Sequence, residues 1–445
     1  MKNNLFIYNT FILPVSLFTI RFLSILNKQY KDFIRVRKED FKRITEFEKT
    51  FSHKEKKIWF HSASLGEYEQ AKPILKKIRK EYPEIKIIIS FFSTSGYKYA
   101  PENNELYDIK IYLPFDKRSY NKTLLKIIKP DLVIYLGYDV WPNFSLILSE
   151  EKIPQYLING TIKENSFRLV FKKFFKKIYN NLNGIIVVSE TMKERYSKIY
   201  PSEKIIVKGD SRIDNVFERK KEIQKIISEE IIKDKFVFII GSSHFDDEKI
   251  ILPVLKHLFV KIKNLIIIFV PHNVSKDNIE DLEKRMNNIK LTYLKYSDYE
   301  REKKFNNEEI ILIDKIGLLF HLYGIADVAY IGGSFKEGIH NVMEPAVFGL
   351  PIICGPIYHN SNEAAEMREK GYLFSIKNSE EFEKNFFELY NNIRQQKEQI
   401  KKDIIEYMEK KRGTADYIFN NIIKKEIERS EKNNGKNRNI YTSTI

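Results

Sequence analysis

Between Lys57 and Ile376, short apolar runs alternate with longer segments in which apolar residues recur at helical spacing. The runs are rich in Ile and Val, as in KIIISFF and LIIIFVP, and they have the length and β-branching of buried strands. Strands that alternate with helices at this spacing favour a parallel sheet covered by helices on both faces. The pattern therefore predicts an α/β fold built from doubly wound sheets.

The predicted strands fall into two groups, which indicates two domains. The first group is 58–61, 86–92, 109–113, 132–136, 155–158 and 184–188, and the second is 236–240, 265–271, 310–313, 328–331 and 372–376. The polar, turn-rich stretch KGDSRIDNV and a charged helix over 216–233 separate the groups. We predict an anchor or interfacial helix at 1–30, Rossmann-like domains at 31–215 and 216–425, and a disordered tail at 426–445.

Composition limits the class of protein. A chain of 445 residues suits two or three domains, because single cores rarely grow past about 250–300 residues. Cys354 is the sole cysteine, which excludes an intramolecular disulfide and a cysteine-based zinc site. The net charge of +16 is compatible with a plain solvated surface or with an anionic partner, such as a membrane, a phosphorylated substrate or a nucleic acid.

The N-terminal segment Leu5–Ile20 is apolar apart from four small polar residues, and Arg21 closes it. It is shorter than the roughly 20 residues that span a bilayer comfortably, and basic residues follow it directly. We expect a monotopic or barely spanning anchor that keeps the body of the protein in the cytoplasm. The alternative is a buried first helix of the N-terminal domain.

A stretch from Tyr330 to Pro356 carries the strongest site signal. Two glycine turns follow a predicted strand, and the second leads into a predicted helix over 342–348 that Asn341 can cap. Free N–H groups and the helix dipole both favour an anion at such a turn. The alternative is an ordinary βα turn. The clustering of His340, Asn341 and Glu344 argues against that alternative.

Polar residues follow other predicted strands as well. Glu67 comes directly after a glycine turn, either as a helix-capping carboxylate or as a general base. Arg212 could clamp a phosphate or carboxylate, or form an ion pair with Asp210 or Asp214. The sequence contains no GxxxxGK[ST], HExxH or Asp-x-Asp motif and no RNP pattern, so a P-loop, a zinc protease site and a metal-bridged nucleotide sugar lack sequence support.

Taken in order, these segments resemble the 3-deoxy-D-manno-octulosonic acid (Kdo) transferases of Gram-negative bacteria. The resemblance rests on an ordered series of blocks across nearly the whole chain: IWFHSASLGE, FSTSGY, PDLVIYLGYDVWPN, INGTIKENSF, VVSE, GDSRIDNV, GSSH, VPHN and GIADVAYIGGSFKEGIHNVMEPAVFGLPIICGP. It implies a GT-B glycosyltransferase, with two Rossmann-like domains facing a central cleft and a short N-terminal membrane anchor. The first domain would serve the acceptor and the second the CMP-sugar.

The resemblance also implies the reaction and its site. Kdo would pass from CMP-Kdo to a hydroxyl of the lipid A precursor, with inversion and without a metal or cofactor, at the cytoplasmic side of the inner membrane and without a nucleic-acid partner. Glu67 would be the base, and Arg212 would stabilise charge in the transition state. The residues expected at the site are Glu67, Arg212 and Asp139 for catalysis; Pro271, His272, Ile316, Gly317, Leu318, Gly333, Ser334, His340, Asn341, Met343 and Glu344 for the donor; and Ser64, Gly66, Trp141 and Asn143 for the acceptor.

One loop departs from the family pattern, which often has Glu-Thr-Glu before Leu-Trp-Pro-Asn. This chain has Gly137, Tyr138 and Asp139 there, so only Asp139 offers a carboxylate. Two other functions remain as alternatives: a GT-B transferase that uses a UDP-sugar, and a non-catalytic basic protein that binds a membrane surface or nucleic acid.

Overall fold

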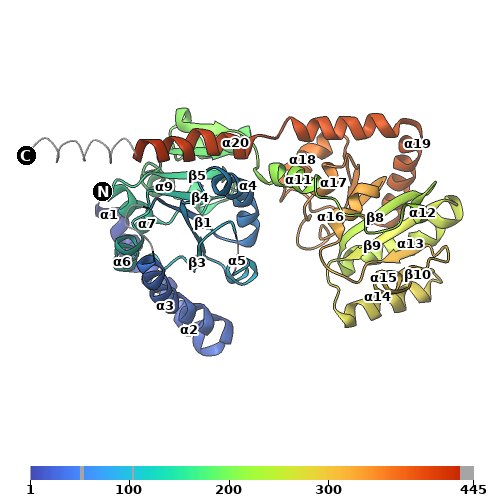
Figure 1. The fold of residues 1–445 in the computed structure, drawn as a ribbon, viewed down its shortest axis with the longest axis horizontal. Coiled ribbons are helices and arrows are strands. Elements are labelled where there is room, and N and C mark those ends of the chain that lie inside the picture. The colour runs from blue at the N-terminus through green and yellow to red at the C-terminus, as the bar shows by residue number, and fades with distance from the viewer. Residues whose placement is uncertain (1, 51–54, 103–104, 431–445) are drawn as a thin grey trace, which may run out of the picture. The chain divides into compact units, whose positions relative to one another are not determined.

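The computed structural model describes residues 2–50, 55–102 and 105–430. It divides into two compact units, one formed by the residues up to Asn215 together with those from Lys411 onward, and the other by Val216–Lys410. Figure 1 shows that each unit is a sheet with helices packed around it. Each unit is described here by itself.

The first unit contains a seven-stranded sheet in the order β3-β2-β1-β4-β5-β6-β7. All neighbouring strands are parallel. The strands are β1 (Lys57–Ser62), β2 (Lys86–Phe91), β3 (Ile109–Tyr112), β4 (Leu132–Leu136), β5 (Gln155–Gly160), β6 (Gly184–Val187) and β7 (Ile205–Val207). The order 3-2-1-4-5-6 is that of a Rossmann sheet, so the doubly wound prediction is confirmed for this unit.

The helices of this unit come from both ends of the chain, because α20 and η4 near the C-terminus belong to it as well. They are α1 (Lys2–Ile7), the π-helix η1 (Tyr8–Ile12), α2 (Leu13–Leu26), α3 (Lys28–Lys49), α4 (Leu65–Glu81), α5 (Thr94–Tyr99), α6 (Arg118–Ile128), α7 (Pro142–Glu150), α8 (Phe167–Val170), α9 (Lys172–Tyr179), α10 (Glu190–Ser197), η2 (Ser202–Lys204), α20 (Thr414–Ile418) and η4 (Phe419–Ile423). Helix α11 (Arg212–Lys220) follows β7.

The second unit repeats the plan with a parallel sheet in the order β10-β11-β9-β8-β12-β13-β14. Its strands are β8 (Phe236–Ser243), β9 (Leu265–Pro271), β10 (Tyr293–Lys295), β11 (Ile310–Leu312), β12 (Val328–Ile331), β13 (Ile352–Cys354) and β14 (Leu373–Ser375). Its helices are α12 (Glu229–Ile232), α13 (Phe245–Lys261), α14 (Lys276–Asn288), α15 (Tyr296–Glu302), α16 (Leu319–Leu322), η3 (Tyr323–Ile325), α17 (Met343–Ala346), α18 (Asn362–Glu369) and α19 (Ser379–Glu409).

Alternation along each strand sends neighbouring side chains to opposite faces of the sheet. In β1, Trp59 packs into the core beneath α6 and α7, whereas Ile58 and Phe60 pack into the core beneath α4. Figure 1 shows α4 on one side of this sheet and α6 and α7 on the other. Burial on both faces explains why the strands appear in the sequence as unbroken apolar runs.

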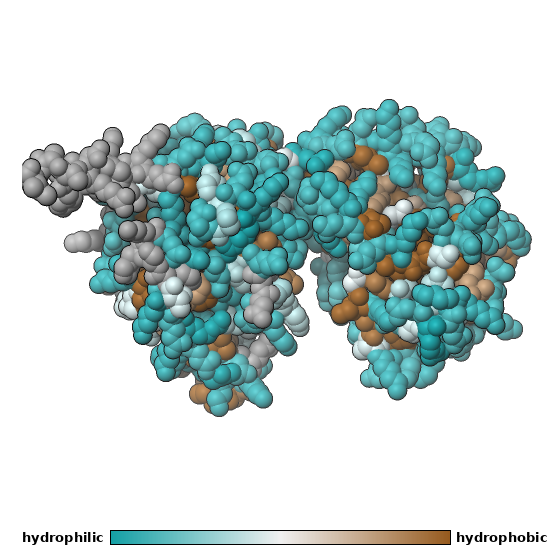
Figure 2. All heavy atoms as spheres, in the orientation of Figure 1, coloured by the Kyte–Doolittle hydropathy of each residue, from teal (hydrophilic) through white to brown (hydrophobic). Residues whose placement is uncertain are grey.

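The N-terminal segment is helical from Lys2 to Leu26, and its Leu5–Leu26 part is long and apolar enough to cross a membrane. Most of it is exposed, and Figure 2 shows hydrophobic residues at the lower end of the first unit, where α2 lies in Figure 1. Its start is tied to the domain: the Tyr8 hydroxyl donates to Asp116 (2.9 Å), and Asn9 and Asn143 exchange hydrogen bonds through their amides. The N-terminal apolar helix of the fold prediction is therefore present.

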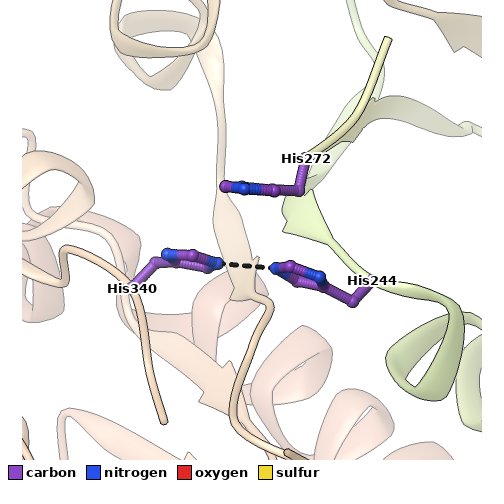
Figure 3. Close-up of side chains that lie close together, drawn as sticks. All are labelled: His244, His272 and His340. Atoms are coloured by element: carbon purple, nitrogen blue, oxygen red, sulfur yellow. Dashed lines mark hydrogen bonds between the residues drawn. The ribbon is translucent and has the colours of Figure 1, made fainter. Parts of the chain in front are cut away.

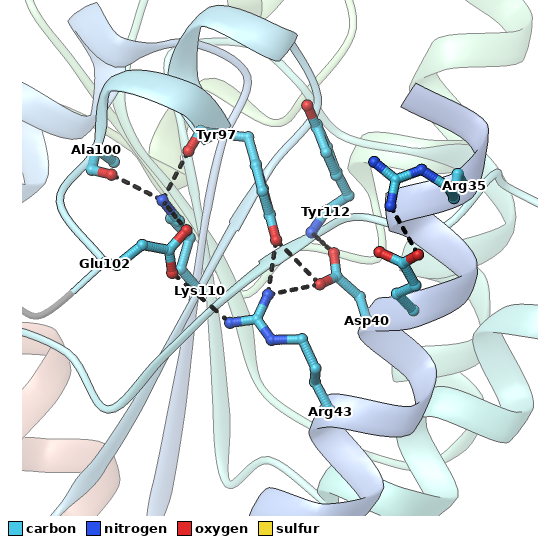
Figure 4. Close-up of polar contacts among 9 residues, drawn as sticks. Arg35, Asp40, Arg43, Tyr97, Ala100, Glu102, Lys110 and Tyr112 are labelled. Atoms are coloured by element: carbon cyan, nitrogen blue, oxygen red, sulfur yellow. Dashed lines mark hydrogen bonds and ion pairs between the residues drawn. The ribbon is translucent and has the colours of Figure 1, made fainter. Parts of the chain in front are cut away.

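Helix α3 is fixed to the edge of the sheet by a polar cluster, shown in Figure 4. Asp40 accepts hydrogen bonds from the Tyr112 backbone N–H (2.7 Å) and from Arg43 (2.9 Å). Arg43 also donates to the Tyr97 hydroxyl, and Lys110 donates to backbone carbonyls of the same loop. These buried and half-buried contacts hold α3 in a fixed orientation on the first unit.

The chain returns to the first unit at its C-terminal end. Ala415, Ile418, Phe419, Ile422 and Ile423 are buried in the core beneath α4, so this segment lies with the first unit although we expected a second domain through 425. Apolar residues at helical spacing must bury one face, and here the first sheet supplies the surface. Residues 426–430 are helical, and the tail expected from 426 otherwise lies outside the described residues.

Three strands escaped prediction: β7, β10 and β13. Each has three residues. β11 and β14 are equally short, but they lie within the predicted runs 310–313 and 372–376. The other three runs carry too little periodicity to identify a strand, and only pairing with a neighbouring strand defines them. The β13 run, Ile352–Cys354, follows Pro351 directly and is fully buried.

Candidate active site

The predicted site residues form two groups, one in each unit. Glu67 is the centre of the first group and lies in the first turn of α4, where Ser64 holds the N-cap position. Its carboxylate accepts a hydrogen bond from the backbone N–H of Ala63. Burial and the negative charge of Asp139 raise the pKa of Glu67 to about 8, against the opposing effects of backbone N–H groups and Arg168. A carboxyl group with such a pKa can take up a proton near neutral pH.

Asp139 connects Glu67 to three other side chains. Its carboxylate accepts a hydrogen bond from the Trp141 indole (3.0 Å) and lies 3.2 Å from the Nε2 atom of His61. Arg168 lies 3.5 Å from its other oxygen. Asp139 and Arg168 are both largely buried, which strengthens the effect of their charges on Glu67.

Gly137 leaves the space that Glu67 occupies. Its φ angle is +70°, and a Cβ atom at this position would lie 2.8 Å from the Oε1 atom of Glu67. This steric conflict explains why this chain has a glycine at position 137, where the family pattern has an acidic residue. It also brings the Glu67 carboxylate against the backbone of the loop that carries Asp139.

We expect Gly137→Ala to displace Glu67 and to lower transfer on the order of 100-fold, since small misplacements of a reacting group have effects of that size. The left-handed backbone adds a cost of about 1–2 kcal/mol in stability. Activity and thermal unfolding of the variant test this. Gly371→Ala is the matched control, because Gly371 also has a positive φ (+76°) but has no atom within 4 Å of the added Cβ. Equal activity losses in both variants would contradict the steric explanation.

The acceptor-side residues differ in accessibility. Ser64 is partly buried, Gly66 is exposed, and Trp141 packs against Phe92 with 4.7 Å between ring centroids and the ring planes tilted by 35°. Asn143 is completely buried, and its amide donates to Asn9 (2.6 Å) and to the backbone carbonyl of Asp116. In this position Asn143 joins the N-terminal helix to the domain, and its side chain does not reach solvent.

Arg212 pairs with Asp210, the first of its two predicted ion-pair partners. Its guanidinium donates to Asp210 Oδ2 (2.7 Å), which also accepts from the Gln70 amide on α4 (2.8 Å). Burial by itself would raise the pKa of Asp210, but the Arg212 guanidinium and its hydrogen bonds hold that pKa below its usual value. A third of the Arg212 side chain remains exposed, so the same guanidinium still has a face toward solvent.

The second group surrounds the turn between β12 and α17. Asp247, buried in the first turn of α13, accepts hydrogen bonds from the backbone N–H groups of His244 (2.9 Å) and Gly333 (2.9 Å) and from the Tyr330 hydroxyl (2.7 Å). Gly333 has a φ of +89°, and an added Cβ would meet the ring of His340. Asp247 thereby holds the backbone of His244 and the backbone of Gly333 in fixed positions relative to each other.

The remaining residues of this turn have different surroundings. Ser334 and Met343 are buried, and Ser334 accepts from the Gly355 N–H (2.6 Å). Asn341 is exposed and accepts from the Met343 N–H (3.1 Å). The prediction that Asn341 caps the helix is wrong, because α17 begins at Met343, one residue later than predicted, and Val342 takes the N-cap position. Glu344 forms an ion pair with Arg219 (2.7 Å). The helix is also shorter than predicted, because α17 ends at Ala346.

Three histidines from three loops form a cluster, shown in Figure 3: His244 after β8, His272 after β9 and His340 after β12. The Nε2 atoms of His244 and His340 are 2.9 Å apart, and the His272 ring stacks on both with centroid distances of 4.4 and 4.8 Å. Burial and the neighbouring imidazoles lower the pKa values of His272 and His340, whereas Glu337 raises both and Asp247 raises that of His340.

The cluster could hold either an anion or a metal ion, since its ligand nitrogens lie within 4.8 Å of one another. The ring planes are within 21° of parallel, and Figure 3 shows His272 above His244 and His340, whose Nε2 atoms face each other. A tetrahedral metal ion needs lone pairs that converge on one point, which requires the rings to turn. In the contact between His244 and His340 one Nε2–H donates to the other Nε2, so only the remaining ring N–H groups could contact an anion.

The last predicted donor-side residues are Pro271, next to His272 of the histidine cluster, and three residues of the loop between β11 and α16. Pro271 ends β9 and is buried, directly before His272. Ile316 is 82% exposed, Gly317 has a φ of +88° with open space around it, and Leu318 precedes α16. Their backbone is accessible to a ligand.

The structure adds His61 and Arg168 to the predicted residues, and it brings His244, from the candidate loop 241–244, into the histidine cluster. Each lies in or beside a block that carries the family resemblance, namely IWFHS, INGTIKENSF and GSSH. A block identifies a segment but does not say which side chain meets another, so only the fold connects His61 and Arg168 through Asp139.

Comparison with known proteins agrees with the blocks. A family model described as 3-deoxy-D-manno-octulosonic-acid transferase (kdotransferase) matches residues 37–215. A 3-deoxy-D-manno-octulosonic acid transferase from Rickettsia bellii is 27% identical over 384 residues, covering 85% of this chain and 88% of the relative. That from Chlamydophila psittaci is 28% identical over 316 residues, covering 69% and 71%. A bifunctional glycosyltransferase/methyltransferase from Fusobacterium nucleatum is 32% identical over 343 residues, or 74% of this chain, and the match spans only 52% of that relative.

A solved structure supports the fold. The UDP-GlcNAc 2-epimerase of Neisseria meningitidis, crystallised with UDP-GlcNAc, superimposes with a TM-score of 0.55 at 15% identity, covering 84% of this chain and all of that one. This likeness, together with the two parallel sheets, confirms the GT-B-like architecture of two Rossmann-like domains. The family model and the relatives together show that the chain is similar to Kdo transferases over most of its length.

Proposed function

We propose that the protein transfers Kdo from CMP-Kdo to a hydroxyl of the lipid A precursor. The observation that carries the proposal is Glu67, a carboxyl group with a pKa raised to about 8, set in the block that the family uses for its base. The relatives named as Kdo transferases extend over most of the chain and support the same substrates.

In the proposed reaction the acceptor hydroxyl attacks the anomeric carbon of Kdo, and its proton passes to Glu67. The bond between the anomeric carbon and the phosphate oxygen breaks, and CMP leaves with the electron pair. Attack opposite the leaving group inverts the anomeric centre. Burial and the charge of Asp139 keep the pKa of Glu67 high enough for it to accept the proton, and Arg168 opposes this rise in pKa. Arg212 would stabilise developing negative charge with its exposed face.

The second unit would bind the donor. Ring N–H groups of the histidine cluster outside the contact between His244 and His340 can donate hydrogen bonds to the phosphate of CMP, which gains negative charge as it leaves. The turn at Gly333 and Ser334 would lie beside this phosphate. Asn341, Glu344 and the backbone near Gly317 would contact the rest of the nucleotide. Charge stabilisation by these donors would need no metal ion.

The proposal is tested by incubating the full chain with CMP-Kdo and a lipid A precursor and analysing the product by mass spectrometry. We expect one or more Kdo additions to the precursor, and thermal stabilisation by CMP that exceeds stabilisation by UDP. Preference for UDP, or hydrolysis of CMP-Kdo without an acceptor product, would reject the proposed reaction.

Removing metal ions tests the role of the histidine cluster. We expect activity to change by less than about twofold after treatment with EDTA and buffer exchange, whereas loss of a catalytic metal ion would cost several kcal/mol of transition-state stabilisation. The measurement is the initial rate before and after treatment, with a mock-treated sample as control. A loss that stoichiometric Zn²⁺ restores would show that the three histidines hold a metal ion in the active enzyme.

The proposed location is the cytoplasmic side of the inner membrane. The apolar helix Leu5–Leu26 and the net charge of +16 both suit an anionic lipid surface, and a phosphorylated lipid acceptor accounts for that charge without a nucleic-acid partner.

A further inference from the structure

The first unit contains an apolar groove between the N-terminal helix and the α8–α9 segment. Its volume is about 1130 Å³, compared with roughly 300–1,000 Å³ for pockets that bind drug-sized ligands. Leu13, Leu17 and Ile20 line it from α2, and Val170, Phe171 and Phe174 line it from the opposite side. Nearly all of its surface is hydrocarbon, so it suits an apolar occupant.

The groove also reaches residues of the candidate active site. Asp139, Trp141 and Arg168 are among its lining residues, and Asp139 contributes, after burial, to the raised pKa of Glu67. The Nε atom of Arg168 is buried and has no hydrogen-bond partner among the described residues. An occupant that reaches these residues therefore meets the Arg168 side chain, which pairs with Asp139 beside the proposed base.

The rim of the groove is apolar and basic. Val170 and Phe171 are 70% and 62% exposed, and the exposed Lys172 and Lys173 follow them and also line the groove. Helix α2 on the other side belongs to a segment with the length and composition of a membrane helix. An apolar groove that is also lined by Arg168, Lys172 and Lys173 matches an anionic amphiphile, with its chain inside the groove and its charged head near Arg168.

We propose that this groove binds an acyl chain of the acceptor lipid and so positions the sugar head at Glu67. The inference rests on the proposed function, because it concerns the acceptor of that reaction. Each methylene that leaves water strengthens binding about fourfold, so a chain in the groove supplies much of the affinity for the acceptor. A deacylated acceptor would then bind far more weakly and still be a substrate.

Two hydroxyl residues on α2 give a matched test. Ser16 lines the groove and donates to the Ile12 carbonyl (2.8 Å), whereas Thr19 is exposed outside the groove and donates to the Val15 carbonyl (3.0 Å). In phosphatidylcholine nanodiscs, Ser16→Trp should raise KM for the acylated acceptor roughly 15-fold, the effect of excluding two methylenes, with kcat little changed. KM for a deacylated phosphorylated acceptor should stay the same, and Thr19→Trp should change neither value.

The proposal would be overturned by an unchanged KM in Ser16→Trp or by equal effects on both acceptors. A changed oligomeric state would also overturn it, because the groove would then be a contact between copies of the chain.

A direct binding measurement separates this test from the proposed function. Dodecyl phosphate should displace a fluorescent fatty acid from the parent and from Thr19→Trp but not from Ser16→Trp. If the parent transfers Kdo to no acceptor while this displacement holds, the proposed function fails and the groove remains a lipid site. If displacement is equal in all three proteins, the groove is not the acyl site.

Discussion

Glu67→Gln is expected to lower kcat for Kdo transfer by about 10²–10⁴-fold, because the amide cannot accept the proton of the acceptor hydroxyl. The side chain keeps its shape, so binding of CMP should be unchanged when measured by calorimetry. Glu69→Gln is the matched control on the same helix, since Glu69 pairs with Lys72 at its surface and has no contact with the Asp139 cluster. A fully active Glu67→Gln enzyme would remove Glu67 from the mechanism.

The pH profile gives an independent measure of the same group. A base must be deprotonated to act, so a pKa of about 8 for Glu67 predicts that kcat/KM falls about tenfold per pH unit below pH 8 and levels off above it. Asp139→Asn removes the negative charge that contributes to this shift and should move the acid limb to lower pH. A profile that is flat between pH 6 and pH 9, with chemistry rate-limiting, would contradict the assignment of the base.

Asp247→Ala is expected to destabilise the second unit by about 3 kcal/mol, because three donors lose their acceptor and the capping box at the start of α13 loses its carboxylate. The donors are the N–H groups of His244 and Gly333 and the Tyr330 hydroxyl, all held by one buried carboxylate. The histidine cluster should loosen with them, and the affinity for CMP should fall on the order of tenfold.

The neighbouring residue supplies the control for this variant. Asp246 lies in the same turn of α13 but is exposed and pairs only loosely with Lys249 (3.4 Å), so Asp246→Ala should change stability by about 0.5 kcal/mol or less. Differential scanning calorimetry and titration with CMP measure both quantities. Similar losses in the two variants would mean that helix-end charge, rather than the buried hydrogen bonds, stabilises the turn.

The sequence predicted the parts of the fold that rest on local patterns. Ile- and Val-rich runs buried on both faces gave strands such as β1, β4 and β9 within a residue or two, because burial on both faces imposes continuous apolar sequence. Two features depended on longer-range packing. The strands β7, β10 and β13 are defined only by pairing with their neighbours. The segment after Lys411 returns to the first unit because its apolar face packs beneath α4.

The site divides in the same way. The glycine turns, Glu67 and His340 were predictable from residue type and position after strands, because such loops gather at one edge of a parallel sheet. The tertiary structure alone decided how these residues act together. It buried Glu67 beside Asp139, which sets its pKa; it placed Asn143 inside the domain; and it stacked three histidines from separate loops. Burial and distance govern charge and hydrogen bonding, and neither quantity is contained in local sequence.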